Sequence, residues 1–399
     1  MKDLTFRLVC REHNNKEKTS LEGYTLENAR QVRQFHESFP MYAPTPLAQL
    51  PGTAKALGIG EIYVKDESHR FGLNAFKVLG GSFAIGNYLA RRLGRTLAET
   101  GYDVLTAKET RETLGDITFI TATDGNHGRG VAWTATTLGQ KSVVHMPRGS
   151  APERLHNIQA AGAKADIIAG NYDDAVRLSR KEAAENGWVV VQDTSWSGYE
   201  EIPGWIMQGY CTMGLEAYEQ LPQKPTHIFL QAGVGSMAAA IAALFADLYG
   251  EDRPKVIIVE PNAADCFYRT AAANDGQMHI VTGDMKTIMA GLACGEPCGL
   301  AWDLLKDYAD YFLAFPDWAA AKGMRILGNP MPGDDRVTSG ESGASAFGAM
   351  AAILTEPELE NIKQQLELDE NSRVLFFSTE GDTDRENYRR IVWGGQLPG

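Results

Sequence analysis

Short apolar runs alternate with longer amphipathic segments along most of the chain. A run of four or five apolar residues between turn residues is typical of a buried strand, and apolar residues spaced three and four apart are typical of a helix. We therefore expect strands at 117–121, 142–146, 165–169, 188–191, 227–230, 256–259 and 374–378. Helices are expected at 81–93, 128–138, 152–161, 173–185, 202–218 and 237–248.

This alternation of strands and helices predicts an α/β fold. Such strands pair in parallel through right-handed crossovers, and the helices cover both faces of the sheet. Because a chain of 399 residues with this many strands usually divides them, we expect two open, mostly parallel sheets flanked by helices. The run at 374–378 lies far from the other strands in sequence, so it would complete an earlier sheet and make the domains discontinuous.

Composition and charge narrow the class of partner. Hydrophobic residues make up 44% of the chain and charged residues 22%, which is typical of a globular protein. The net charge of −13 argues against a nucleic-acid partner, because proteins that bind nucleic acid present a basic face. No apolar stretch approaches the length of a membrane span, and residues 1–30 contain no apolar signal region. We therefore expect a cytoplasmic protein with a small-molecule partner, no nucleic acid and no membrane.

The cysteines point away from a disulfide framework and from a zinc site. The chain has five of them, Cys10, Cys211, Cys266, Cys294 and Cys298, and none is in a Cys-x-x-Cys pair. We expect no bound metal.

Lys77 is the first candidate for chemistry. It lies between Phe76 and Val78, just ahead of the helix expected at 81–93. Desolvation disfavours the charged form of a lysine, so a buried lysine is a usable amine nucleophile. The alternative, which is the commoner case, is a lysine whose charged end reaches water along an apolar surface.

The second candidate is the strand-to-helix turn at 121–130, which holds Asp124, Asn126 and His127 among glycines. In open α/β sheets, ligands bind at the carboxyl ends of strands. Glycine also lets the backbone approach a ligand closely. The alternative is an ordinary polar turn in which Asp124 caps the helix.

The third candidate is a glycine-rich loop at 231–238, directly after the strand expected at 227–230. Consecutive backbone N–H groups at a helix N-terminus bind phosphate. The candidate phosphate ligands are Gly233, Val234, Gly235, Ser236 and Met237. The loop also fits Gly-x-Gly-x-x-Ala, with the acidic Glu260 ending the next strand, as in dinucleotide sites. An NAD-dependent dehydrogenase is therefore the alternative.

Two smaller features lie at strand ends. Asp193 follows the strand expected at 188–191, and Ser378 and Thr379 end the last strand. Asp193 is either a site residue or a solvated loop acid, and the two hydroxyls either bind a ring nitrogen or cap a turn. A buried lysine, a phosphate cradle and a terminal hydroxyl together fit pyridoxal 5′-phosphate. NAD would need the cradle but not the lysine.

Several segments of the chain resemble motifs of known enzymes. Five segments resemble motifs of the fold type II pyridoxal phosphate enzymes, which include tryptophan synthase β chains and threonine dehydratases. These segments are NAFKVLGG (74–81), DGNHGRG (124–130), AGVGSMAA (232–239), SGESGA (339–344) and STEGDTD (378–384). More closely, the chain resembles the diaminopropionate ammonia-lyase family. That likeness is carried by KDESHRFGLNAFK (65–77), TDGNHGRGVAW (123–133), NYDDAVRL (171–178), VVQDTSW (190–196) and TIMAGLACGEP (287–297), together with SGESGA and STEGDTD. The matching segments are long and span most of the chain.

The resemblance implies the fold type II architecture. It implies a large, discontinuous cofactor-binding domain at 1–82 and 200–399, a small α/β domain at 83–199, and an active site in the cleft between them. It also implies a homodimer. The reaction would be the α,β-elimination of D- and L-2,3-diaminopropionate to pyruvate and two molecules of ammonia. A serine or threonine dehydratase-type lyase is the alternative, but generic dehydratases carry a small residue where this chain has Asp124.

The resemblance also implies roles for the cofactor-binding residues. Lys77 would hold the cofactor, with Phe76 beside it. Asn126 would bind the cofactor 3′-oxygen, and Glu341 would belong to the cofactor site. Ser378 is the first choice for the ring nitrogen because it aligns with the corresponding serine of tryptophan synthase β chains, with Thr379, one residue away, as the alternative.

The chemistry of the substrate implies roles for the acids. A base on one face of the cofactor, such as Lys77, reaches the α proton of only one enantiomer. Acceptance of the other enantiomer requires a second base on the opposite face, and Asp124 is the candidate. Because the β-amine leaves poorly unless it is protonated, an acid or charged partner is needed near the β-carbon, and Asp193 is the candidate.

Overall fold

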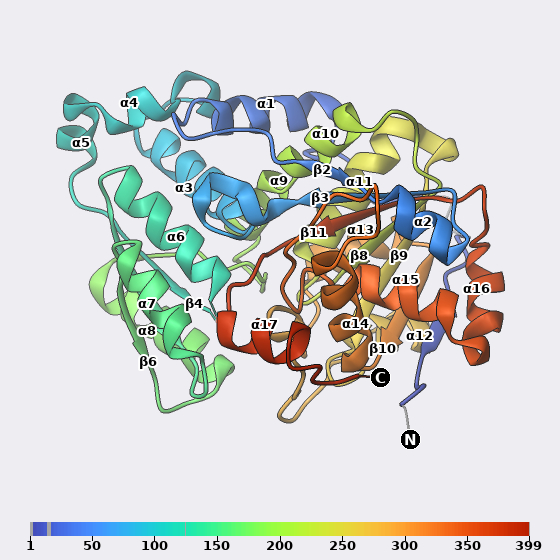
Figure 1. Ribbon diagram of the computed structural model, residues 1–399. Helices are drawn as coiled ribbons and strands as arrows, with labels where there is room; N and C mark the ends of the chain where they lie inside the picture. Colours follow the sequence, from blue (N-terminus) through green and yellow to red (C-terminus); the bar gives the residue numbers. More distant parts are fainter. Residues whose placement is uncertain (1–2, 14–16, 124, 399) are drawn as a thin grey trace. The chain divides into compact units, whose positions relative to one another are not determined.

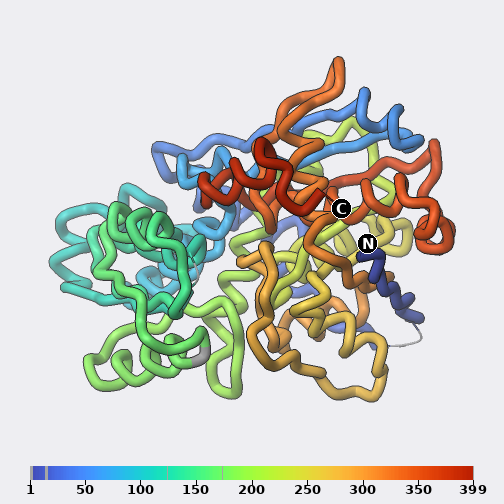
Figure 2. Tube along the Cα trace, turned by 60° about the horizontal axis from the view of Figure 1, so that its bottom comes forward, coloured from blue at the N-terminus to red at the C-terminus, as the bar shows by residue number. Residues whose placement is uncertain are grey.

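In the computed structural model, residues 3–13, 17–123 and 125–398 are described, and the chain divides into two compact units (Figure 1). Unit 1 consists of Met1–Thr25, Pro44–His69 and Met213–Gly399. Unit 2 consists of Leu26–Ala43 and Arg70–Thr212. Each unit is therefore assembled from separate stretches of the sequence. The colours of Figure 2 show that early, central and late stretches of the chain all contribute to unit 1.

Unit 1 contains a seven-stranded sheet. Its strands, in their order across the sheet, are β1 (Arg7–Cys10), β10 (Tyr311–Phe315), β9 (Lys255–Pro261), β8 (His227–Gln231), β11 (Arg373–Ser378), β3 (Glu61–Asp66) and β2 (Leu47–Gln49). Pairing is parallel from β10 to β3. The two edge strands, β1 and β2, are antiparallel to their neighbours. The carboxyl ends of the five parallel strands consequently lie along one edge of the sheet.

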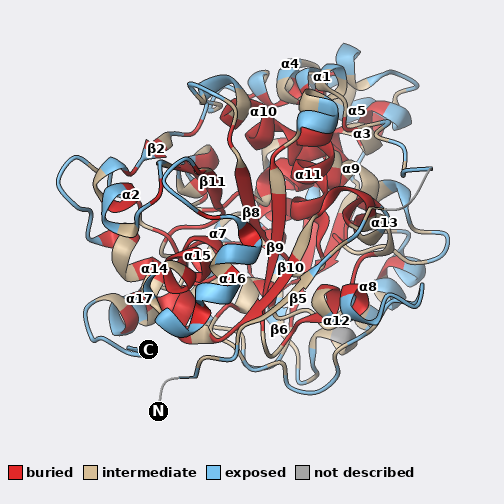
Figure 3. Cartoon of the chain, turned by 90° about the vertical axis from the view of Figure 1, so that its right-hand side faces the viewer, coloured by how far each residue is buried: buried red, intermediate tan, exposed pale blue. Residues whose placement is uncertain are grey.

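Helices cover both faces of this sheet. They are α2 (Pro51–Leu57), α10 (Cys211–Gln220), α11 (Ser236–Tyr249), α12 (Cys266–Ala273), α13 (Gly299–Tyr308), α14 (Asp317–Gly328), α15 (Ser345–Thr355), α16 (Glu360–Leu366) and α17 (Arg385–Val392). Alternate residues of the strands, such as Phe229 and Ile257, join a core with α14 and α15, and the residues between them are also buried. Figure 3 shows the resulting contrast between the buried central strands and the exposed outer side of α16.

Unit 2 contains a four-stranded parallel sheet in the order β6 (Lys164–Ile167), β5 (Lys141–Met146), β4 (Thr118–Ala122) and β7 (Val189–Val190). Its helices are α1 (Leu26–Glu37), α3 (Val78–Arg92), α4 (Tyr102–Thr106), α5 (Lys108–Leu114), α6 (Asn126–Thr137), α7 (Pro152–Ala160), α8 (Tyr172–Asn186) and α9 (Glu201–Gly209). Consecutive residues of β5 enter different cores, Val144 with Ile158 of α7 and Val143 with Ala183 of α8. Because side chains alternate along a strand, helices cover both faces here too.

The expected fold class is confirmed, since both sheets are mostly parallel and flanked by helices. Every expected strand is present within two residues of its predicted bounds, and β1, β2, β3 and β10 are additional. The helix expected at 202–218 is interrupted at Tyr210 and forms α9 and α10, and the helix expected from 81 begins at Val78. Apolar periodicity does not reveal the interruption, because both α9 and α10 bury apolar residues.

Two further observations concern the cysteines and the apolar character of the helices. The five cysteines all lie in the described residues and form no disulfide. Among the described residues, no helix combines the length and the apolar character that crossing a membrane would require.

Candidate active site

The Lys77 amine lies against a buried carboxylate of unit 2. Lys77 immediately precedes α3, and Asp193 follows β7 by three residues. Nζ of Lys77 donates to Oδ2 of Asp193 at 2.6 Å, and the two side chains are 20% and 7% exposed. Lys77 is therefore partly buried and paired, and Asp193 is not a solvated loop acid.

The protonation state of Asp193 follows from its neighbours. Burial alone raises the pKa of this carboxyl, but attraction to Lys77 and to His127 and the hydrogen bond from Lys77 outweigh it and lower the pKa to about 2. His127 is buried, and its Nε2 donates to the carbonyl oxygen of Val191 at 2.8 Å, because a carbonyl only accepts. At neutral pH Asp193 is thus a carboxylate, which accepts hydrogen bonds and carries negative charge.

The loop before Lys77 has an unusual backbone. Phe71, Gly72 and Asn74 have φ angles of 49°, 70° and 58°. Such angles are unfavourable for a bulky side chain and persist only where the surroundings hold them. The ring of Phe71 stacks on Trp133 of α6 at 5.1 Å between centroids. Aromatic packing against α6 therefore holds in place the loop that precedes Lys77.

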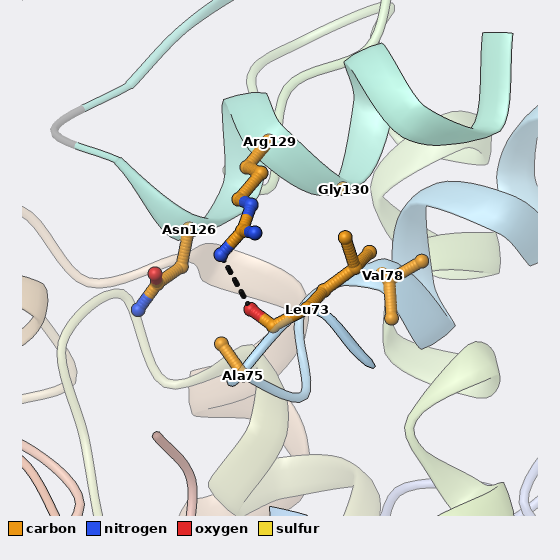
Figure 4. A pocket seen from close by; sticks show the side chains of 6 residues that line it. All are labelled: Leu73, Ala75, Val78, Asn126, Arg129 and Gly130. Carbon is orange, nitrogen blue, oxygen red and sulfur yellow. Dashed lines mark hydrogen bonds between the residues drawn. The ribbon is translucent and has the colours of Figure 1, made fainter. Parts of the chain in front are cut away.

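A small hollow lies where this loop meets the start of α6 (Figure 4). It is lined by Leu73, Ala75, Val78, Asn126, Arg129 and Gly130. Asn126 is the first residue of α6, and Arg129 donates from Nη1 to the carbonyl oxygen of Leu73 at 2.8 Å. A Cβ on Gly130 would lie 2.9 Å from Cα of Val78, so only glycine allows α6 to approach this closely. Asp124, predicted for the same turn, lies outside the described residues.

Phe76 packs against Tyr210, which the sequence does not single out. Their ring centroids are 4.8 Å apart, and both residues are buried. The Tyr210 hydroxyl has no hydrogen-bond partner among the described residues. Burial raises the pKa of Tyr210 well above its usual value, so the group stays protonated.

The glycine-rich loop of unit 1 has the geometry of an anion site. It connects the end of β8 to α11, and Gly235 has φ 91°. A Cβ on Gly235 would lie 2.3 Å from Cζ of Phe267, and a Cβ on Gly233 would lie 2.8 Å from the carbonyl oxygen of Gly291. The first N–H groups of α11, at Ser236 and Met237, follow at once and have no acceptor within the helix. This arrangement fits a phosphate.

The motifs SGESGA and STEGDTD form one tightly packed group in unit 1. A Cβ on Gly340 would lie 2.5 Å from the carbonyl oxygen of Gly381, so the two loops are in backbone contact. Ser378 ends β11, and its Oγ donates to Oγ of Ser339 at 2.7 Å. The Glu341 carboxylate accepts a hydrogen bond from Nδ2 of Asn387 at 2.5 Å. The buried hydroxyls and the phosphate loop therefore belong to the same unit.

Gln231 connects the end of β8, where the glycine-rich loop begins, to the end of β11. It is the last residue of β8, and its Nε2 donates to the carbonyl oxygen of Phe377 at 2.8 Å and to Oγ1 of Thr379 at 2.9 Å. The sequence contains a signal for it, since Gln231 is the polar end of the apolar run HIFLQ. No such signal marks Tyr210.

Glu260 does not have the surroundings that the dinucleotide alternative requires. Its Oε1 accepts from the backbone N–H of Phe267 at 2.9 Å, and its Oε2 accepts from that of Tyr268 at 2.7 Å. Both oxygens therefore hold the first turn of α12, whereas a dinucleotide site needs an acid that binds a ribose hydroxyl.

The predicted residues fall into two groups. Unit 2 holds Phe76, Lys77, Asn126 and Asp193. Unit 1 holds Glu341, Ser378, Thr379 and the loop Gly233, Val234, Gly235, Ser236 and Met237. Each group combines buried polar atoms with glycines that leave no room for a side chain.

Comparisons with known proteins extend over both units. A family model described as pyridoxal-phosphate dependent enzyme matches residues 39–380. The chain is similar to a diaminopropionate ammonia-lyase of Salmonella typhimurium, with 50% identity over 371 residues, or 92% of each chain. It is also similar to the crystal structure of the holo diaminopropionate ammonia lyase from Escherichia coli, with a TM-score of 0.92 and 44% identity over 99% of this chain and 98% of that one. A crystal structure of the Escherichia coli enzyme in complex with D-serine has a TM-score of 0.92 and 44% identity over 98% of both chains.

Proposed function

Because the chain belongs to the pyridoxal-phosphate dependent enzyme family, we propose that it is an ammonia-lyase that converts 2,3-diaminopropionate and water to pyruvate and two molecules of ammonia. The 50% identity to a diaminopropionate ammonia-lyase over 92% of both chains supports this substrate. The structural observation that carries the proposal is the 2.6 Å contact between the Lys77 amine and the buried Asp193 carboxylate. It supports both amine chemistry and the binding of a positively charged substrate.

The predicted residues of each unit, taken by themselves, suit a part of pyridoxal 5′-phosphate. Lys77 would hold the cofactor covalently through Nζ, with Phe76 beside it and Asn126 at its 3′-oxygen. The glycine loop, Gly233–Met237, would hold its phosphate, and Ser378 or Thr379 would meet its ring nitrogen. When bound, the cofactor withdraws electrons from the substrate and so acidifies the proton on the α-carbon.

Removal of the α proton is assigned to two bases. Lys77, once its amine is released, takes this proton from the enantiomer whose proton faces it. Asp124 takes the proton of the other enantiomer from the opposite face. The similarity to an enzyme crystallised with D-serine supports a site that admits D-amino acids.

Asp193 is assigned to the substrate's β-ammonium group. As a buried carboxylate, it attracts a positive charge that serine and threonine lack. At about 4 Å this attraction is worth on the order of 1–4 kcal/mol, depending on the local dielectric. It also keeps the β-nitrogen protonated, and a protonated amine leaves more readily.

We further propose a homodimer, which the family resemblance supports. Light scattering after size exclusion checks this directly, because a dimer has twice the 43.6 kDa of the chain. A mass near 43.6 kDa contradicts it.

The function is tested by pyruvate release from D- and L-2,3-diaminopropionate, with L-serine and L-threonine as comparisons. We expect diaminopropionate to be the best substrate. Preference for serine or threonine would show a dehydratase instead. Borohydride reduction followed by mass spectrometry should place a pyridoxyl group on the peptide that contains Lys77, and Lys77→Ala should abolish this adduct. A reducible adduct on another lysine contradicts the assignment.

A further inference from the structure

We infer that Gln231 is a positioning residue that fixes the Thr379 hydroxyl as the hydrogen-bond donor to the cofactor's ring nitrogen. The inference rests on the proposed function, because it needs pyridoxal 5′-phosphate in the site. It deepens that proposal by choosing between Ser378 and Thr379 and by adding a residue for which no role was predicted.

The orientation of the Gln231 amide is determined by the backbone. The carbonyl oxygen of Phe377 lies 2.8 Å from one end of the amide. A carbonyl accepts hydrogen bonds and never donates them, so the NH₂ end must face it. Gln231 is 3% exposed, so water does not offer an alternative arrangement.

This orientation determines the role of the Thr379 hydroxyl. Nε2 of Gln231 also lies 2.9 Å from Oγ1 of Thr379, and an NH₂ group only donates. Oγ1 of Thr379 must therefore accept, and its single proton points elsewhere. Thr379 is 4% exposed, and no described residue accepts that proton. A buried hydroxyl with an uncommitted proton calls for an acceptor.

Ser378 is less suited to this role. Its Oγ donates to Oγ of Ser339 at 2.7 Å, so its only proton already has an acceptor. A proton that Ser378 donates to Ser339 is not available to a ligand. Because Ser378 donates to Ser339, the proton left over in this pair is on Ser339, whereas the proton left over in the pair of Gln231 and Thr379 is on Thr379.

A second unsatisfied atom lies in the same group. Oε1 of Gln231 is buried without a hydrogen-bond partner among the described residues. A buried amide oxygen without a partner destabilises the protein. The NH₂ end of Gln231, by contrast, has two acceptors, so the amide is held by that end.

The chemistry of the ring nitrogen favours such a donor. An unprotonated pyridine nitrogen is an acceptor and matches the Thr379 proton. A protonated nitrogen is itself a donor, so the Thr379 proton would stay unsatisfied. The geometry therefore keeps this nitrogen neutral, which weakens the electron withdrawal but is sufficient for an elimination.

The inference is tested with cofactor labelled with nitrogen-15 in the ring, observed by solid-state NMR in the holoenzyme. We expect the resonance of a neutral, hydrogen-bonded pyridine nitrogen. Thr379→Val removes the donor at constant shape, so the resonance should move toward that of a pyridine without a donor, and Thr379→Ser should restore it. Gln231→Met should shift it in the same direction, because the Phe377 carbonyl then competes for the Thr379 proton. Ser378→Ala should leave it in place.

A second readout is cofactor affinity. Loss of one hydrogen bond should raise the Kd for pyridoxal 5′-phosphate about tenfold in Thr379→Val and in Gln231→Met. Thermal unfolding of each apoprotein separates this effect from a general loss of stability.

The outcomes separate the inference from the proposed function. A nitrogen resonance that moves in Ser378→Ala overturns the choice of Thr379, and one that stays fixed in Gln231→Met overturns the positioning role. In both cases the cofactor would still be reducible onto Lys77. If borohydride attaches no cofactor to Lys77 in the unaltered protein, the proposed function itself fails.

Discussion

Asp193 is a carboxylate because Lys77 and His127 outweigh the effect of its burial on its pKa. In the proposed reaction the same negative charge faces the substrate. The Asp193 carboxylate thus pairs with the Lys77 amine in the structure, and we propose that it selects the substrate in the reaction. The two roles are separable, because only the second depends on the charge of the substrate.

The selectivity of Asp193 gives a direct prediction. Asp193→Asn keeps the shape and removes the charge, so we expect the kcat/KM ratio of diaminopropionate to L-serine to fall at least tenfold, or about 1.4 kcal/mol. Asp116→Asn is the matched control, since Asp116 is an exposed acid of the same unit and pairs with Lys141. An unchanged ratio in Asp193→Asn means that Asp193 does not set the selectivity.

The second acid gives a prediction about stereochemistry. If Asp124 is the base for the enantiomer that Lys77 does not serve, Asp124→Asn should lose activity with D-diaminopropionate by 10²-fold or more, a typical effect of removing a general base. Activity with the L-enantiomer should fall much less. Initial rates with each pure enantiomer check this, and equal losses contradict the two-face assignment.

The site residues differ in how visible they are in the sequence. Lys77, the glycine loop and Asn126 lie in distinctive segments next to strands, so their positions at strand and helix ends were predictable. The contact of Lys77 with Asp193 was not, because it joins residues 116 apart along the chain. Tyr210 belongs to an apolar stretch that looks like ordinary core, and only packing brings it to Phe76.

At the level of elements, glycines set how closely α3 and α9 approach. A Cβ on Gly209 would lie 2.5 Å from the carbonyl oxygen of Leu79, and a Cβ on Gly80 would lie 2.7 Å from Cγ2 of Ile206. Since Lys77 immediately precedes α3, this contact also positions the amine.

The contact predicts opposite effects for two substitutions in one helix. Gly209→Ala should destabilise the protein by about 1–3 kcal/mol, because the added methyl meets backbone that cannot move aside. Gly204→Ala, also in α9, has nothing within 4 Å of the new Cβ. It should stabilise the protein by about 0.5–1 kcal/mol through helix propensity. Chemical denaturation of both variants checks this, and a stable Gly209→Ala would show that α3 and α9 can move apart.

β3 is one of the four strands that were not expected from the sequence, and the reason is physical. Its residues Glu61–Asp66 read EIYVKD, so it ends in charged residues that normally mark a strand's limit. Lys65 and Asp66 are nevertheless 0% and 4% exposed. The partners of Lys65 lie elsewhere in the chain, at Thr45 and Glu216, so no local pattern accounts for its burial.

At the level of the whole molecule, Lys65 belongs to a buried ionic group in unit 1. Its Nζ lies 2.7 Å from Oε2 of Glu216 and donates to the carbonyl oxygen of Thr45 at 2.6 Å. Oγ1 of Thr45 donates to Oε1 of Glu67 at 2.6 Å. These residues lie within five residues of three of the four points where the chain passes from one unit to the other, at 43/44, 69/70 and 212/213.

Removal of the Lys65 ammonium should be costly. Lys65→Met removes the cation that lies 2.7 Å from the buried Glu216 carboxylate, so we expect the free energy of unfolding to fall by about 3–5 kcal/mol. Lys363→Met is the control, because Lys363 is partly exposed and pairs loosely with Glu360 at 3.5 Å. It should change stability by no more than about 0.5 kcal/mol. Similar losses in both variants would contradict a special role for the buried pair.

The position of β11 has a consequence for biosynthesis. Of the strands of the seven-stranded sheet, β11 comes last in the sequence, yet it lies in the interior of the sheet between β8 and β3. Until it emerges from the ribosome, β3 and β8 each present an unpaired edge, and such edges invite pairing with other chains. The nascent polypeptide therefore depends on its final strand to complete the sheet, and premature termination before Arg373 would yield an aggregation-prone fragment.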